Sequence, residues 1–258
     1  MNKSVVVVGL GEMGSVFARG FLRSGYTVHP VVRGVDMQTV ADTVELPELV
    51  LIAVGEADLH EQLANIPPVW KDRIVLLQNE LLPADWEKYD LEPTVISVWF
   101  EKKKGQDSKV IIPSPVFGKH AALIAEALAS IDIATTVLTD KAALLHELVL
   151  KNVYILTTNI SGLEVGGNVG RLWAEHNAVA YDVASDVITL QEALIGQRLN
   201  RHELINGMVK AFDGDREHMC MGRSAVARLQ RALSLAAEKG LSLKVLEKIS
   251  NTIPAQKQ

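Results

Sequence analysis

The chain has 258 residues, of which 48% are hydrophobic, and this is enough for one large core or two smaller ones. The formal net charge of −5 argues against a nucleic-acid-binding surface, and no apolar run approaches the length of a membrane span. The single cysteine, Cys220, excludes a disulfide within the chain. Because no secretory signal pattern precedes the first apolar run, we expect a cytoplasmic protein with neither nucleic acid nor membrane as a partner.

Short β-branched runs alternate with helical patterns up to about residue 139. Several predicted strands are apolar on both faces, which is typical of a parallel sheet covered by helices on both sides. The alternation of strands and helices predicts a doubly wound α/β sheet of the Rossmann type. The predicted strands are Ser4–Val8, Thr27–Val32, Leu49–Val54, Arg73–Gln78, Thr94–Phe100, Lys109–Pro113 and Ala134–Leu138, and the predicted helices are Glu12–Ser24, Ala57–Ala64 and Lys119–Ser130.

The strand signals fade after residue 139. Asp140 is a residue type that caps helix N-termini, and it precedes a long helical pattern that begins at Lys141. We therefore predict a Rossmann-type domain at 1–139 and an all-α domain at 140–258. Further helices are predicted at Arg171–Leu194, Arg201–Phe212, Gly222–Lys239 and Ser242–Ile249, with Gly240 as a C-terminal cap.

A glycine-rich turn follows the first predicted strand and opens an amphipathic helix. In the pattern G-x-G-x-x-G, the first glycine permits a tight turn, the second lets the backbone approach a pyrophosphate, and the third lets the helix pack close to the strand. Unpaired N–H groups at the start of the helix favour a phosphate. The alternative is a strand–helix turn without a ligand. The predicted cofactor-binding residues of the turn are Gly9, Leu10, Gly11, Glu12, Met13 and Gly14.

The end of the second strand distinguishes NAD from NADP. An NAD site places Asp or Glu there to bind the ribose 2′-hydroxyl, whereas an NADP site places a cation there to bind the 2′-phosphate. Arg33 follows this strand, and its guanidinium can hold a phosphate through two N–H groups. Asp36 lies farther on, beyond a glycine. We therefore predict NADP as the cofactor, the alternative being that Arg33 is an ordinary surface arginine.

Two polar residues are candidates for the chemistry. Asn79 follows the fourth predicted strand, where its amide can bind a nicotinamide carboxamide or a substrate carbonyl, although asparagine also forms turns. Lys151 interrupts an apolar helical stretch, and a protonated lysine beside a carbonyl oxygen stabilises the alkoxide that forms as hydride arrives. A lysine that only caps the core is the alternative. His218 is a second candidate for the acid.

With these residues, the chain resembles the ketopantoate reductase (2-dehydropantoate 2-reductase) family, as a divergent member of the 6-phosphogluconate dehydrogenase-like superfamily. Enzymes of this family reduce a 2-oxo acid with NADPH in pantothenate biosynthesis. The resemblance implies the same glycine turn and an NADP-selecting arginine, and it also implies a homodimer. By this resemblance the arginine is Arg33, the catalytic lysine is Lys151, the site asparagine is Asn79, and the asparagine eight residues beyond the lysine is Asn159.

The sequence departs from the family pattern where the family binds its substrate. Ile155 stands where the family has an asparagine. The family places a serine and a glutamate near the start of its last long helix, whereas this stretch contains Ser224 and no carboxylate, with Arg223 and Arg228 beside it. We expect Ser224 to contact the substrate, and we expect an altered site that suits a more anionic compound.

Two functions are consistent with these features. The first is an NADP-dependent oxidoreductase that transfers hydride to a small 2-oxo acid, with Lys151 and Asn79 as catalytic residues, Asn159 and Ser224 at the substrate, and no metal. The second is a non-catalytic NADP(H)-binding sensor or regulatory protein on the same scaffold. The missing glutamate and Ile155 motivate the second hypothesis.

Overall fold

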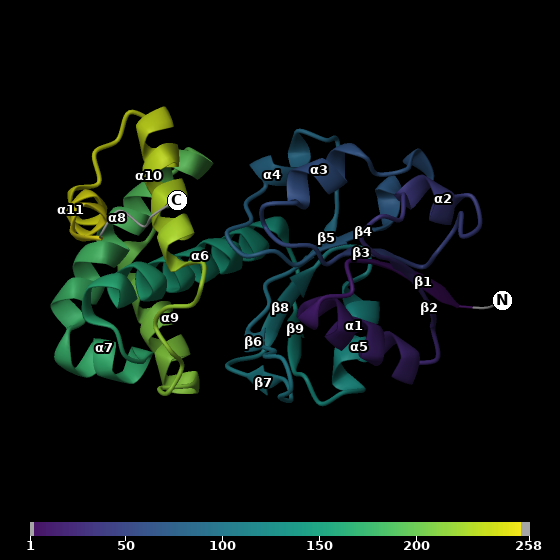
Figure 1. Cartoon of the computed structure of the whole chain (residues 1–258), viewed down its shortest axis with the longest axis horizontal. Coiled ribbons are helices and arrows are strands. Elements are labelled where there is room, and N and C mark those ends of the chain that lie inside the picture. The colour runs from purple at the N-terminus through teal and green to yellow at the C-terminus, as the bar shows by residue number, and fades with distance from the viewer. Residues whose placement is uncertain (1–2, 254–258) are drawn as a thin grey trace. The chain divides into compact units, whose positions relative to one another are not determined.

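The computed structural model describes residues 3–253 and divides into two compact units, with the division between Leu148 and Val149. The first unit is α/β and the second is all-α, which confirms the predicted fold class (Figure 1). The division falls inside the long helix α6 (Lys141–Val165), whereas the sequence suggested a boundary just before this helix. Among the described helices, none combines the length and apolar character that a membrane span requires.

The first unit is built on a seven-stranded sheet with the order β2-β1-β3-β4-β5-β8-β9. Five strands run parallel to one another: β1 (Ser4–Val8), β2 (Thr27–Val31), β3 (Val50–Ile52), β4 (Ile74–Leu76) and β5 (Thr94–Ile96). The chain passes from β1 to β2 on one side and then crosses to β3 on the other side, so the winding reverses beside β1. In doubly wound sheets, this reversal opens a crevice at the carboxyl ends of the strands.

The far edge of the sheet differs from the prediction. The predicted strand at 109–113 is wrong in extent, because only β7 (Lys109–Val110) forms there, and it pairs with β6 (Phe100–Glu101) in a separate two-stranded sheet. The strand that joins the main sheet is β8 (Ser114–Phe117), which runs antiparallel to β5 and parallel to β9 (Thr135–Val137). Pro115 hides β8 in the sequence, because proline lacks the N–H of a normal ladder. In β8, Pro115 instead accepts a hydrogen bond from the backbone N–H of Ser97.

Helices cover both faces of the sheet, as Figure 1 shows for the first unit. Alternate residues of β1 point to opposite faces, so Val5 and Val7 belong to one hydrophobic core and Val6 and Val8 to the other. Helices α1 (Glu12–Arg23) and α5 (Ala121–Ala129) complete the first of these cores and pack closely on each other. The second core is covered by α2 (Met37–Ala41), α3 (Leu59–Ala64), the 3-10 helix Pro68–Arg73, α4 (Ala84–Glu87) and the first turns of α6.

The second unit consists of helices packed around α8. The predicted N-cap of α6 is confirmed, because the Asp140 carboxylate accepts a hydrogen bond from the backbone N–H of Ala143 at 2.8 Å. The predicted single helix over 171–194 is wrong, since the chain breaks at His176, where the backbone leaves the helical conformation. The apolar periodicity continues across this one-residue break and therefore does not reveal it. The helices after α6 are α7 (Val169–Glu175), α8 (Asn177–Ile195), α9 (Arg201–Gly214), α10 (Ala225–Glu238) and α11 (Lys244–Thr252).

Candidate coenzyme and substrate site

The three glycines of the turn after β1 have different reasons to be glycine. Gly9 has φ +91°, and a Cβ there would lie 2.8 Å from the carbonyl oxygen of Ala53. A Cβ on Gly14 would lie 1.9 Å from the carbonyl oxygen of Gly9. Among the described residues outside the turn itself, no atom lies within 4 Å of a Cβ built on Gly11. The fold itself therefore requires glycine at positions 9 and 14, whereas the open space at Gly11 fits a ligand that approaches the backbone.

The start of α1 offers hydrogen-bond donors to such a ligand. Gly11 is the N-cap of this helix and, as a glycine, has no side chain with which to cap the first N–H groups. The first N–H groups of a helix have no partner within the helix and carry the positive end of its dipole, so they bind anions well. A pyrophosphate therefore fits the turn on steric and electrostatic grounds.

A cavity of about 680 Å³ lies beside this turn, where the winding of the sheet reverses. Its volume is in the range of small-molecule and cofactor sites. The loops after three neighbouring strands form it, and Asp58, Glu61 and Gln62 extend its wall onto the loop and helix after β3. The residues from the three loops are Gly9, Leu10 and Gly11 after β1, Val32, Arg33, Gly34 and Val35 after β2, and Ala53, Val54 and Gly55 after β3.

Not all of the predicted cofactor-binding residues line this cavity. Within the described chain, Glu12, Met13 and Gly14 are absent from its wall. Met13 instead packs against the core between α1 and the sheet, and the carboxylate of Glu12 lies 3.6 Å from the ammonium group of Lys102. The backbone of these residues forms the start of α1, but their side chains do not line the cavity.

Arg33 is an exposed residue in the tight turn that follows β2. The backbone N–H of Val35 donates to the carbonyl of Val32 at 2.9 Å and closes this turn, with Gly34 at φ +86°. The turn brings Arg33 to the cavity wall, whereas Asp36 is the N-cap residue of α2 and is not among the described residues that line the cavity. The end of β2 thus presents a guanidinium, which suits a phosphate, and not the carboxylate that suits a ribose hydroxyl.

The carboxyl end of β4 carries Asn79, which lies one strand farther along the same edge of the sheet. Its side-chain amide donates to the carboxylate of Glu56, in the loop after β3, at 3.0 Å. The preceding Gln78 is buried and donates to the carbonyls of Ile52 and Val54 at 2.7 and 3.2 Å, so it joins the ends of β3 and β4. Asn79 is therefore held in place by two neighbouring loops.

The backbone after Asn79 is unusual. Glu80 has φ +62°, in the left-handed region that favours glycine. A non-glycine residue held there costs about 1 kcal/mol or more and persists only where the surroundings enforce it, which happens often at ligand-binding sites. The strained turn thus places Asn79 at a position where a functional constraint is expected.

The second unit brings three of its polar residues together on α6 and α10. Lys151 and Asn159 stand two turns apart on α6, and these residues are only 9% and 8% exposed. The side-chain carbonyl of Asn159 accepts a hydrogen bond from Nη1 of Arg228 on α10 at 3.0 Å. Burial, and secondly the positive charge of Arg228, lower the pKa of Lys151 from 10.5 to about 7. We call these three residues the Lys151 cluster.

Ser224 lies one helical turn before Arg228. The serine is exposed and is the N-cap residue of α10, but its side chain makes no capping hydrogen bond. The backbone N–H of Arg228 donates to the carbonyl of Ser224 at 2.9 Å, so the two side chains lie on the same face of α10. Ile155, in contrast, belongs to the buried core.

His218 and Cys220, the two other residues considered for catalysis, lie in surroundings typical of structural residues. The ring of His218 lies 6.2 Å from the ring of Tyr154, measured between centroids, and its backbone carbonyl accepts from the N–H of Val169. Burial raises the pKa of the Cys220 thiol to about 11. Because a thiolate is the nucleophilic form of cysteine, Cys220 is unsuited to nucleophilic catalysis at neutral pH.

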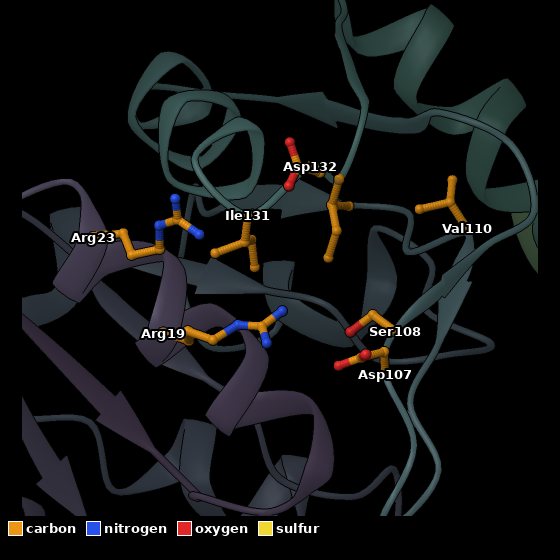
Figure 2. A pocket seen from close by; sticks show the side chains of 8 residues that line it. Arg19, Arg23, Asp107, Ser108, Val110, Ile131 and Asp132 are labelled. Atoms are coloured by element: carbon orange, nitrogen blue, oxygen red, sulfur yellow. The ribbon is translucent and has the colours of Figure 1, made fainter.

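A second cavity, of about 300 Å³, lies elsewhere in the first unit. Figure 2 shows Arg19 and Arg23 of α1 on one side of it and Asp107 and Ser108 on the other. Asp132 also lines it, so its two arginines are balanced by two carboxylates. None of the predicted site residues lines this cavity.

No protein-family model and no curated protein sequence matches the chain. Solved structures do. A ketopantoate reductase from Ralstonia eutropha JMP134 has a TM-score of 0.67 at 14% identity, and a dimeric ketopantoate reductase from Staphylococcus aureus has 0.66 at 15%. D-mandelate dehydrogenase, solved with NADH, has a TM-score of 0.66 at 13% identity. Each similarity covers 96% of both chains, so this chain has the fold of the ketopantoate reductases over almost its full length.

Proposed function

We propose that the protein is an NADP-dependent oxidoreductase that transfers hydride to the carbonyl carbon of a small 2-oxo acid. The observation that carries the proposal is the cavity in which the open backbone of Gly11 and the guanidinium of Arg33 occur together. The structural relatives support the nicotinamide coenzyme and the oxo-acid substrate of this proposal, because D-mandelate dehydrogenase was also solved as a ternary complex with NADH and anilino(oxo)acetate, a compound with an oxo group beside a carboxylate.

In this proposal the chain binds and orients two ligands. The backbone at Gly11 and the start of α1 hold the pyrophosphate of NADPH, and Arg33 holds its 2′-phosphate. The side-chain carbonyl of Asn79, whose amide donates to Glu56, accepts a hydrogen bond from the nicotinamide carboxamide. When bound, NADPH supplies the hydride.

Lys151 is the general acid of the proposed reaction. The carbonyl oxygen gains negative charge as the carbonyl carbon is reduced, and the Nζ–H of protonated Lys151 stabilises this charge and then transfers the proton, so that a 2-hydroxy acid forms. An acid is most effective when its pKa lies near the working pH, and the pKa of Lys151 is about 7. Asn159 and Ser224 contact the substrate.

The first unit is the NADP-binding domain of this proposal, and the second unit is the substrate and dimerisation domain. We propose a homodimer, as described for the Staphylococcus aureus ketopantoate reductase. The fold and the lysine are compatible with ketopantoate reduction in pantothenate biosynthesis, in the cytoplasm. A panel of 2-oxo acids that includes ketopantoate, followed by the loss of NADPH absorbance, tests the reaction and identifies the substrate.

Replacing Arg33 with glutamine is expected to weaken NADPH binding about tenfold or more and to leave NADH binding unchanged, because charge-assisted hydrogen bonds contribute about 1.5–3 kcal/mol. Calorimetric titration of both coenzymes measures the effect. Arg23→Gln is the matched control, since Arg23 is also an exposed arginine but lies outside the coenzyme cavity. A wild-type protein that binds NADH as tightly as NADPH would show that Arg33 does not select the coenzyme.

The second candidate is a non-catalytic NADP(H)-binding sensor or regulatory protein. It is favoured by Ile155 and by the absence of a carboxylate in the first turn of α10, where Ser224 and Arg228 stand instead. This candidate predicts tight NADPH binding without oxidation by any 2-oxo acid in the panel. Turnover of about 1 s⁻¹ or faster, which is ordinary for enzymes, excludes it.

A further inference from the structure

The Lys151 cluster combines a buried cationic group, Lys151, with a half-buried one, Arg228. The charge of Arg228 opposes the protonation of Lys151, which is almost fully buried. Like charges at short range destabilise each other more strongly in a protein interior than in water. A bound anion that contacts both groups would convert this repulsion into two attractions, so the cluster is suited to a negatively charged ligand.

The orientation of Arg228 is fixed by Asn159. The 3.0 Å hydrogen bond from Nη1 of Arg228 to the side-chain carbonyl of Asn159 joins α10 to α6, and Asn159 is itself only 8% exposed. The Asn159 amide also donates to the hydroxyl of Thr158 at 3.4 Å, and this hydroxyl donates in turn to the carbonyl of Tyr154 at 2.9 Å. The guanidinium is therefore held by a chain of hydrogen bonds that ends on the backbone of α6.

A 2-oxo acid has the two groups that such a cluster needs. Its carboxylate is bonded directly to the carbonyl carbon, so a lysine at the carbonyl oxygen and an arginine at the carboxylate are neighbours. Arginine holds a carboxylate through two parallel N–H groups, which fixes the position of the anion as well as binding it. The ligand would thus be held at both ends of its reacting fragment.

We infer that Arg228 is the specificity-determining residue of the substrate site and that it binds the carboxylate adjacent to the reacting carbonyl. The inference rests on the proposed function. It limits the substrate class to 2-oxo acids with an ionised carboxylate and excludes esters, simple ketones and aldehydes as good substrates.

The test compares the best 2-oxo acid from the panel with its methyl ester, which keeps the carbonyl but lacks the charge. We expect the wild-type protein to prefer the acid about a hundredfold or more in kcat/KM. Arg228→Gln removes the charge, so it should lower kcat/KM for the acid about a hundredfold and lower that for the ester far less. Arg228→Lys should recover part of the loss for the acid.

The matched control is Arg171→Gln, because Arg171 is an exposed arginine of the same unit that pairs with Glu175 on its own helix. This variant should change kcat/KM neither for the acid nor for the ester. A second readout is the pH profile of the acid. Because Arg228 helps to lower the pKa of Lys151, Arg228→Gln should move the alkaline limb of kcat/KM to higher pH. An equal loss for acid and ester, with an unmoved pH profile, would overturn the inference.

Calorimetric titration of the NADPH-bound protein with oxamate separates this inference from the proposed function. Oxamate has an oxo group beside a carboxylate but does not turn over. We expect it to bind the wild-type protein and to bind Arg228→Gln about a hundredfold more weakly. If no 2-oxo acid is reduced but oxamate binding still depends on Arg228, the proposed reaction fails and the carboxylate site stands. Equal oxamate binding by both proteins refutes the carboxylate site whether or not 2-oxo acids are reduced.

Discussion

Replacing Lys151 with methionine is expected to lower kcat/KM for 2-oxo acid reduction about a thousandfold while leaving NADPH binding unchanged. General-acid catalysis by a positioned side chain contributes typically about 10²–10⁴-fold, and methionine fills a similar volume without donating a proton. Steady-state kinetics measure the loss, and NADPH titration measures the binding. Lys210→Met is the control, because Lys210 is an exposed lysine on α9 of the same unit. Activity that survives in Lys151→Met would remove Lys151 from its role as the acid.

The same variant should be more stable than the wild-type protein at neutral pH. The pKa of Lys151 is about 7 in the folded protein and 10.5 in an unfolded chain, so the unfolded chain binds more protons between these two values. Stability therefore rises with pH across this window, and the cost of the buried charge is fully present below pH 7. Removing the lysine should raise the free energy of unfolding by up to roughly 5 kcal/mol below pH 7, since one pKa unit corresponds to about 1.4 kcal/mol.

Denaturant unfolding at pH 6.5 and pH 10 measures this difference. The gain in stability of Lys151→Met should be large at pH 6.5 and small at pH 10, and Lys210→Met should show no such pH dependence. A lysine that only caps the core at an exposed position would give no gain at either pH. Equal stability of Lys151→Met and the wild-type protein at pH 6.5 would contradict the burial of a titrating lysine.

Replacing Gly14 with alanine is expected to destabilise the first unit, and replacing Gly11 with alanine is expected to spare the fold but impair the coenzyme site. A Cβ at position 14 would lie 1.9 Å from a backbone carbonyl oxygen, so α1 must move away from the sheet. Forced overpacking of this kind costs typically 1–3 kcal/mol, and occasionally more. At position 11 the Cβ meets no described atom beyond the turn itself, and the expected cost is about 1 kcal/mol or less, from the poorer N-cap.

Each glycine variant serves as the control for the other, because one should change stability and the other should change NADPH binding. Thermal unfolding should show a clear fall in the midpoint for Gly14→Ala and little change for Gly11→Ala. NADPH titration of Gly11→Ala should show at least about tenfold weaker binding, because the methyl group occupies the space through which a pyrophosphate approaches the backbone. Unchanged NADPH binding in Gly11→Ala would mean that the open space beside this residue is not a ligand site.

The proposed coenzyme cavity was more predictable from sequence than the proposed substrate site, for a physical reason. The glycine turn is local, since the strand, the turn and the helix follow one another in 20 residues, and each glycine has a conformational task that appears in the pattern. Arg33 could be predicted as a phosphate-binding candidate because it directly follows the predicted second strand. In contrast, the bond from Arg228 to Asn159 joins residues 69 positions apart, and only helix packing brings them together.

Other features of the fold were not predicted from the sequence, because they too depend on contacts between distant segments or on single residues. The bond from Asn79 to Glu56 joins the loops after two adjacent strands, and the signal that could have revealed it was the shared carboxyl edge of β3 and β4. Pro115 concealed β8, and a single non-helical residue at His176 divided a continuous apolar pattern. The helical period of α6 predicted the helix correctly, but it did not show that Leu144 and Leu148 pack in the core of the first unit.

Calorimetric titration of the full chain with NADPH, beside NADH, tests the coenzyme assignment on which the proposed reaction depends. We predict saturable NADPH binding at least about tenfold tighter than NADH binding, together with a higher midpoint of thermal unfolding in the presence of NADPH. The absence of any NADPH binding and of any shift in the midpoint, at concentrations that saturate dehydrogenases, would contradict both the coenzyme site and the proposed reductase.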